Sequence, residues 1–144
     1  LLRDVLEDIA PDEPVVVFCR FHKDLEAVNR VADETGRRSL EFSGRVDELK
    51  RWQLGEAPVL AVQIDSGGVG VDLTRARYAI YYSLGFSLGS YEQSLARIHR
   101  PGQTRPVEYI HLLAEGTVDE KVMAALTRRA DVVNTVLQQI KGLP

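Results

Sequence analysis

The sequence predicts a single α/β domain built on an open parallel sheet of about five to six strands, with helices on both faces and a long C-terminal helix. Two patterns along the 144 residues support this prediction. Short runs of β-branched and apolar residues alternate with segments in which apolar residues recur at every third and fourth position. Glycine and proline stand between most of these segments, where turns are expected.

The first third of the chain alternates helix and strand. Apolar residues at helical spacing predict a short helix over residues 1–9, and the continuous apolar run 15–19 predicts a strand buried on both faces. A second helix is predicted from about residue 22 to 34, and we expect it to stop at Gly36. The pattern over residues 38–42 indicates a further strand, although more weakly.

The middle of the chain continues the alternation. A polar helix is predicted over residues 46–54, and apolar runs predict strands over 59–64 and 78–82. Residues 83–89 resemble a loop, and a helix is predicted over residues 91–99, before Pro-Gly interrupts it.

The end of the chain is predicted to hold one strand and one long helix. Residues 107–113 form the last expected strand. Thr117 and Glu120 form a capping-box pattern, and the apolar residues that follow sustain an amphipathic helix to about residue 140. No internal repeat or low-complexity linker divides the chain, which favours a single domain over residues 1–144.

Composition excludes several classes of protein. Hydrophobic residues make up 44% of the chain and charged residues 27%, which is typical of a globular protein rather than a disordered or membrane-spanning one. The net charge of −3 argues against a histone-like, polybasic mode of nucleic-acid binding. A single cysteine excludes an intramolecular disulfide and favours a reducing, cytoplasmic setting. Because the first residue is leucine, we expect a piece of a longer protein.

A glycine-rich segment over residues 64–72 follows the predicted strand 59–64. In open parallel sheets, ligands bind at the carboxyl ends of the strands, and glycine lets the backbone approach a ligand closely. A tight turn is the simpler interpretation. A dinucleotide fingerprint fails because Leu73 stands where its third glycine is required, and the chain contains no GxxxxGK[ST] phosphate loop.

Two arginines on the predicted helix 91–99 and just after it form the second candidate segment. Arg97 and Arg100 are three residues apart, so on a helix they share a face and can direct two guanidinium groups at one anion, such as a triphosphate. Two arginines alone would more simply be a solvated basic surface. Four of the 18 basic residues are lysine and the rest arginine, which either favours such bidentate contacts or reflects genome composition.

The string Gln93-x-x-x-Arg97-x-His99-Arg100-x-Gly102-Gln103 resembles motif VI of the Swi/Snf-type translocases, within the superfamily-two helicases. Other segments are similar to further motifs of this family, in the same order along nearly the whole chain. They are Val15-Val16-Val17-Phe18 with Cys19-Arg20-Phe21 (motif IV), Phe42-Ser43-Gly44, residues 67–73 (motif V), and the closing strand and helix over 107–113 and 116–122.

The resemblance implies the second, C-terminal RecA-like lobe of a two-lobed motor, with ATP bound between the lobes. It implies that Arg100 is the arginine finger, that Arg97 is a second contact to the γ-phosphate, and that Gln93 helps to align them. ATP and Mg²⁺ would be held mainly by the N-terminal lobe of the same protein. Proteins catalyse phosphoryl transfer mainly by positioning the reactants and by placing positive groups where they stabilise the negative charge of the transition state. The isolated lobe is therefore not expected to hydrolyse ATP.

The glycine-rich segment would complete the nucleotide site. By resemblance, Asp72 would lie near the ribose, and Gly68 and Gly70 would let the backbone come close to ATP. Asp72 stands where most Swi/Snf-type members carry Asn, and this and other departures suggest a compact bacterial or phage-like branch.

The second partner implied by the resemblance is nucleic acid, double-stranded DNA in the first place. Phosphate contacts need only hydrogen-bond donors and cations. The candidates for these contacts are Arg20, Phe21, Ser43, Gly44, Arg45 and Ser66.

Other residues have simpler interpretations. Cys19 and His22 lack a second pair of ligands, so we expect no metal site. Trp52 is expected in the core rather than on a base-stacking surface. Two rival functions stay open: a non-catalytic nucleic-acid-binding or scaffolding module with the same fold, and a small NAD-binding enzyme.

Overall fold

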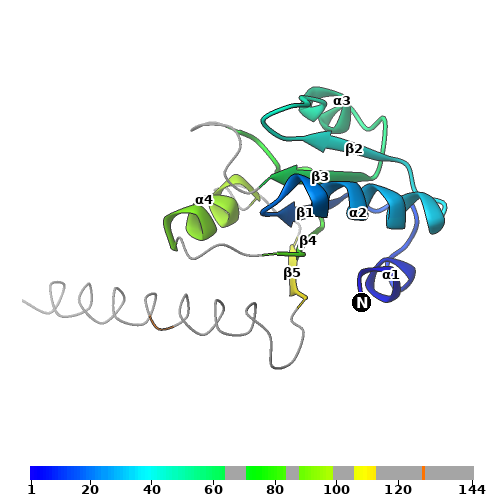
Figure 1. Cartoon of the computed structure of the whole chain (residues 1–144), viewed down its shortest axis with the longest axis horizontal. Coiled ribbons are helices and arrows are strands. Elements are labelled where there is room, and N and C mark those ends of the chain that lie inside the picture. Colours follow the sequence, from blue (N-terminus) through cyan, green and yellow to red (C-terminus); the bar gives the residue numbers. More distant parts are fainter. Residues whose placement is uncertain (64–70, 84–87, 99–105, 113–127, 129–144) are drawn as a thin grey trace, which may run out of the picture.

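In the part of the chain that the structure describes, five strands run parallel in one sheet, in the order β2-β3-β1-β4-β5 (Figure 1). The computed structural model describes residues 1–63, 71–83, 88–98, 106–112 and Arg128. The strands are β1 (Val15–Cys19), β2 (Ser39–Phe42), β3 (Val59–Gln63), β4 (Tyr78–Tyr81) and β5 (Glu108–His111). The helices are α1 (Leu2–Glu7), α2 (His22–Glu34), α3 (Leu49–Gln53) and α4 (Leu88–Ile98). The predicted parallel α/β fold is confirmed.

Strand β1 lies at the centre of the sheet. It pairs with β3 on one side and with β4 on the other, so that Val15 lies opposite both Val59 and Tyr78. All five of its residues are buried. A continuous run of apolar residues suits this position because helices cover both faces of the strand.

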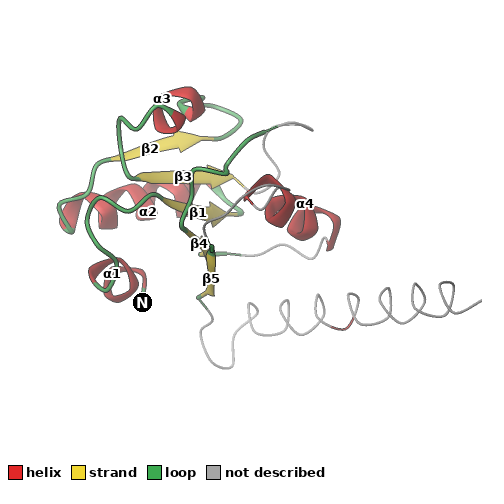
Figure 2. Ribbon diagram, turned by 180° about the vertical axis from the view of Figure 1, so that it is seen from behind, coloured by secondary structure: helices red, strands yellow, loops and turns green. Residues whose placement is uncertain are grey.

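Two layers of helices enclose the sheet. Helices α1 and α2 pack on the face toward which Val15, Val17 and Cys19 point, whereas α3 and α4 pack on the face of Val16 and Phe18. Figure 1 shows α2 in front of the strands, and Figure 2, from behind, shows it beyond them. Alternate residues of one strand therefore enter two separate cores, as the period of two along a strand requires.

The end of α2 follows the sequence pattern. The helix spans the predicted residues, and Gly36, two residues past its last turn, adopts a φ of 76°. This left-handed conformation is open to glycine without strain and is common where helices end.

Two predicted helix boundaries were wrong. Helix α3 begins at Leu49 rather than at Val46, because the chain folds back against β2: the Ser43 N–H donates to the Val46 carbonyl over 2.7 Å, and the Glu48 N–H donates to the Glu41 carbonyl over 2.9 Å. Helix α4 begins at Leu88, within the segment predicted as a loop. The long helix predicted over 117–140 lies outside the described residues, except for Arg128.

A buried arginine holds α1 in place. Arg37 is 7% exposed, and its Nη2 donates to the carbonyl oxygens of Leu6 and Ile9, the latter over 2.6 Å. Carbonyls at the end of a helix lack partners within it, so this guanidinium satisfies groups that burial would otherwise penalise. Among the described residues, no helix is both long enough and apolar enough to span a bilayer.

Candidate functional site

The carboxyl ends of β1 and β4 carry the first group of candidate residues. Arg20 and Phe21 follow β1 and are both exposed, with the Arg20 guanidinium 5.0 Å from the centre of the Phe21 ring. The Arg20 main-chain N–H donates to Ser83 Oγ over 2.8 Å, and Ser83 Oγ donates to Asp24 Oδ2 over 2.8 Å. Ser83 and Asp24, which sequence reasoning missed as site residues, thus fix the backbone from which Arg20 and Phe21 project.

The loop after β2 is held by its own serine. Ser43 is 8% exposed, and its Oγ accepts hydrogen bonds from the main-chain N–H groups of Arg45 and Val46 and donates one to Glu41 Oε2 over 2.8 Å. The side chain of Ser43 therefore shapes the loop. Gly44 is exposed and carries the part of this loop that faces solvent.

Gln63 joins that loop to the strand before the glycine-rich segment. Gln63 is the last residue of β3, and its Oε1 accepts the Gly44 N–H over 3.2 Å. Residues 64–70 follow directly. This hydrogen bond therefore links the loop after β2, which holds predicted nucleic-acid contacts, to the glycine-rich segment, which holds predicted nucleotide contacts. The spacing of residues along the sequence did not indicate it.

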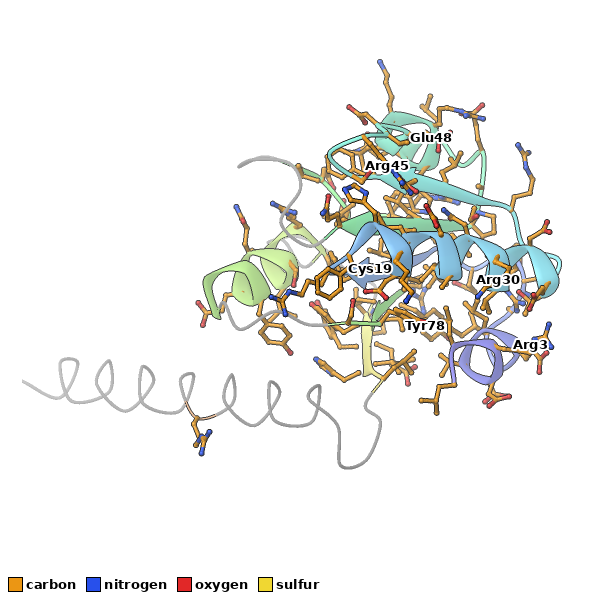
Figure 3. The ribbon with its side chains drawn as sticks, in the orientation of Figure 1. Arg3, Cys19, Arg30, Arg45, Glu48 and Tyr78 are labelled. Carbon is orange, nitrogen blue, oxygen red and sulfur yellow. The ribbon has the colours of Figure 1, made fainter. Side chains whose placement is uncertain are left out.

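Arg45 is paired with carboxylates. Its Nε lies 3.2 Å from Glu41 Oε2 and its Nη1 lies 3.3 Å from Glu26 Oε1, and the hydrogen bond to Glu41 is the main reason that the pKa of Arg45 is raised. Figure 3 shows Arg45 on the segment that connects β2 to α3. The pair with Glu26 is exposed and contributes little to stability, so Arg45 can exchange that carboxylate for another anion at small cost. The Glu41 side chain is only 8% exposed, so releasing it costs more.

The segment after residue 70 contacts α3 and α4. Asp72 Oδ1 accepts hydrogen bonds from the Thr74 N–H over 2.9 Å and from Thr74 Oγ1 over 2.6 Å, and the Asp72 carbonyl accepts one from Gln53 Nε2 over 2.8 Å. The next residue, Leu73, donates its N–H to the Arg97 carbonyl over 2.9 Å. The structure therefore brings Asp72 and Arg97, two predicted site residues distant in sequence, to neighbouring positions.

Helix α4 carries Arg97 and Gln93 one turn apart. Gln93 is exposed, whereas Arg97 is only 4% exposed and lies near the end of the helix, next to the buried Ile98. A guanidinium and a carboxamide are both hydrogen-bond donors suited to phosphate oxygens. The other predicted residues of this group, Arg100, Gly68 and Gly70, and also Ser66, lie outside the described residues.

Cys19 and Trp52 have the structural roles expected of them. Both side chains are fully buried. Burial raises the pKa of the Cys19 thiol, with smaller effects from the charges of Asp24 and Glu41, so that the thiol stays neutral. His22, by contrast, is exposed. Within the described ranges, no group of three or more histidine, cysteine and acidic side chains could hold a metal ion.

An aromatic stack lies between the sheet and α4. The ring centres of Phe18 and Tyr81 are 5.0 Å apart, and His111 stacks on Tyr81 with 4.7 Å between the ring centres and 6° between the ring planes. His111 Nε2 is 2.8 Å from the Tyr91 hydroxyl. Burial lowers the pKa of His111 below its usual value of 6.5.

The lowered pKa of His111 predicts a pH-dependent stability. The unfolded chain binds the proton more readily than the folded one, so the contribution of His111 is present above about pH 6.5 and is lost as the pH falls below it. We expect the unfolding temperature to fall less between about pH 7.5 and about pH 5.5 in His111→Phe than in the parent chain. Thermal unfolding followed by circular dichroism measures this difference, and equal slopes would contradict the prediction. The exposed His22, changed to Gln, is the control.

The chain resembles proteins of one family. Residues 1–102 match the family described as helicase conserved C-terminal domain. The chain is 28% identical over 148 residues to the DNA repair protein RAD5 of Cryptococcus neoformans, an alignment that covers 95% of this chain and 12% of that protein. It is 31% identical to RAD5 of Candida glabrata, with 86% and 12% covered. The chromatin-remodeling ATPase INO80 of Cryptococcus neoformans is 31% identical over 100 residues, with 69% and 6% covered.

Solved structures agree with this likeness. The C-terminal part of the Fun30 ATPase domain superposes with a TM-score of 0.74 at 25% identity and covers 87% of this chain, which corresponds to 43% of that chain. The helicase domain of Pyrococcus furiosus Hef has the same fold, with a TM-score of 0.64 at 22% identity over 86% of this chain and 26% of that one. The chain thus spans a small part of the length of the proteins that it resembles.

Proposed function

The chain belongs to the helicase conserved C-terminal domain family, as a Swi/Snf-type RecA-like lobe of superfamily two, and from this premise we propose that it works as half of an ATP-driven motor on DNA. The match over residues 1–102 carries this proposal. The printed names of its relatives, a DNA repair protein and a chromatin-remodeling ATPase, support DNA as the partner. Duplex DNA is the form that we propose.

The nucleotide is proposed to bind between this lobe and the N-terminal lobe of the same protein. When bound, ATP supplies the phosphoryl group whose transfer to water drives the motor. The 144 residues contain no phosphate loop, so that loop and the Mg²⁺-binding carboxylates are assigned to the other lobe. On this lobe we propose Arg100 as the arginine finger, Arg97 as a second γ-phosphate contact and Gln93 as an aligning group.

The chemistry of the described residues fits this assignment. Arg97 and Gln93 offer donors to phosphate oxygens, and the backbone hydrogen bond between Leu73 and Arg97 joins the end of the glycine-rich segment to α4. We assign Asp72, together with Gly68 and Gly70, to the region of the nucleotide around the ribose. A main-chain hydrogen bond therefore connects the two segments that we propose to bind one nucleotide.

The proposed nucleic-acid track runs along the carboxyl ends of β1, β2 and β3. Arg20 and Phe21 project from one loop, and Gly44 and Arg45 from another, with Ser43 shaping the second loop. Ser66 is assigned to the same track. Because Arg45 is paired with Glu41 and Glu26, a phosphate must displace these carboxylates. Each phosphate contact by Arg20 or Arg45 releases counterions from DNA, so we expect binding to weaken as the salt concentration rises.

The test is ATP hydrolysis by the intact protein that contains this lobe. We expect turnover to rise when duplex DNA is added, and the 144-residue chain alone to hydrolyse no ATP. If the intact protein binds DNA but shows no hydrolysis with duplex or single-stranded nucleic acid, the function is that of a binding or scaffolding module. Tight binding of NAD to the chain would instead support the small-enzyme alternative.

A further inference from the structure

Helix α4 is held to the rest of the lobe by polar groups along one side. Tyr91, Ser94 and Arg97 are spaced three residues apart, so they follow one another along a face of the helix. Each makes a hydrogen bond to a different segment: Tyr91 to β5, Ser94 to β4, and the Arg97 carbonyl to Leu73. Hydrogen bonds are directional, whereas apolar packing is not, so these contacts restrict the rotation of α4 about its axis.

The contact between Ser94 and β4 has a defined direction. Ser94 Oγ donates its single proton to the Tyr91 carbonyl over 2.5 Å. The Tyr81 hydroxyl, 2.7 Å away, must therefore donate to Ser94 Oγ. Burial raises the pKa of Tyr81, which keeps the hydroxyl protonated and able to donate.

The contact between Tyr91 and β5 depends on a fixed histidine ring. His111 lies parallel to Tyr81, with 4.7 Å between the ring centres, and this stack sets the direction in which Nε2 points. The Tyr91 hydroxyl meets Nε2 at 2.8 Å. Tyr91 and His111 are separated by 20 residues, so strand β5 is coupled to the helix by a bond that neither element could form alone.

We propose that Tyr91 and His111 are positioning residues for ATP hydrolysis: their hydrogen bond sets the rotation of α4 and thereby the placement of Arg97. This inference rests on the proposed function of the lobe. Catalysis by a positioned charge is sensitive to small displacements, since a misplacement of about 1 Å can cost on the order of a hundredfold in rate. The pair acts through α4 and does not touch the nucleotide.

The first variant is Tyr91→Phe in the intact protein, which removes one hydroxyl and leaves the ring. We expect kcat for DNA-stimulated ATP hydrolysis to fall roughly tenfold, with the KM for ATP changed by less than about twofold. The unfolding temperature should stay within about two degrees of the parent. Tyr109→Phe removes the same atom from a half-buried tyrosine of β5 and should retain the parent kcat.

The second variant separates positioning from packing. His111→Phe retains a ring that can stack on Tyr81 but has no Nε2, and we expect the same loss of kcat as in Tyr91→Phe. If the two residues act through one hydrogen bond, the double variant is no slower than the slower single variant. Losses that multiply in the double variant, or a parent-like kcat in Tyr91→Phe, overturn the inference.

One further comparison distinguishes this inference from the function on which it rests. If the intact parent protein shows no DNA-stimulated hydrolysis, the proposed function itself is wrong. If Arg100→Ala retains the parent rate, the assignment of the arginine finger is wrong. If Arg100→Ala is inactive while Tyr91→Phe and His111→Phe hydrolyse ATP at the parent rate, only the role of the hydrogen bond is wrong.

Discussion

Replacing Arg100 with alanine is expected to lower ATP turnover of the intact protein by at least about a thousandfold. During phosphoryl transfer, negative charge develops on oxygens that a guanidinium can contact with two parallel hydrogen bonds. Alanine provides neither charge nor donor, so the transition state loses that stabilisation. Because the remaining contacts bind ATP in its ground state, the loss should appear in kcat rather than in the KM for ATP. Steady-state hydrolysis with saturating duplex DNA measures both constants.

Two matched variants control for the change of charge. Arg38→Ala removes an exposed arginine just before the edge strand β2 and should leave turnover unchanged. Arg100→Lys retains the positive charge without the planar fork and should recover only part of the rate. Turnover within about threefold of the parent in Arg100→Ala would contradict the assignment of the finger.

Replacing Trp52 with alanine is expected to destabilise the chain by about 3–5 kcal/mol. The side chain is fully buried in the core between α3 and the sheet, and its Nε1–H donates to the Pro58 carbonyl over 3.1 Å. The Arg75 guanidinium lies 5.0 Å from the ring and also donates to the Trp52 and Ala57 carbonyls. Alanine leaves a large cavity and removes the surface on which this guanidinium rests. Urea unfolding followed by circular dichroism measures the change in the free energy of unfolding.

Two further variants calibrate this result. Trp52→Phe retains most of the packing and loses the N–H donor, so it should cost less than Trp52→Ala. Leu54→Ala changes a residue that is 73% exposed and should shift the free energy of unfolding by less than about 0.5 kcal/mol. A cost below about 1 kcal/mol for Trp52→Ala would contradict the role of the indole in the core.

The sequence predicted elements whose pattern is local. Strand β1 and helix α2 have the predicted bounds, because a run of buried valines and a stripe of apolar residues each depend on neighbours a few positions away. Helix α3 was predicted too long because Val46 and Glu48 hydrogen-bond to the β2 segment. Those bonds compete with the first turn of the helix, and a helical periodicity does not reveal them.

The same distinction between local patterns and distant contacts applies to the candidate site. The sequence predicted that Gln93 and Arg97 lie on one helix, and it contained the motifs of the family. The partners that hold those groups were not, because they come from distant positions: Gln63 is 19 residues from Gly44, and Ser83 is 59 residues from Asp24. The pairing of Arg45 with Glu26 and Glu41 likewise depends on where α2 lies beside β2.

By itself, then, the sequence determined the parallel α/β fold, the order of its elements and the family, because periodicity and motif spacing are properties of short stretches of chain. Only the tertiary structure decided which polar groups meet. The strand order places β1 between β3 and β4, and β5 beside β4, so that the stack of Tyr81 and His111 forms and Tyr91 finds its partner. Hydrogen bonds act over about 3 Å, and contacts this short between distant residues exist only after the sheet has assembled.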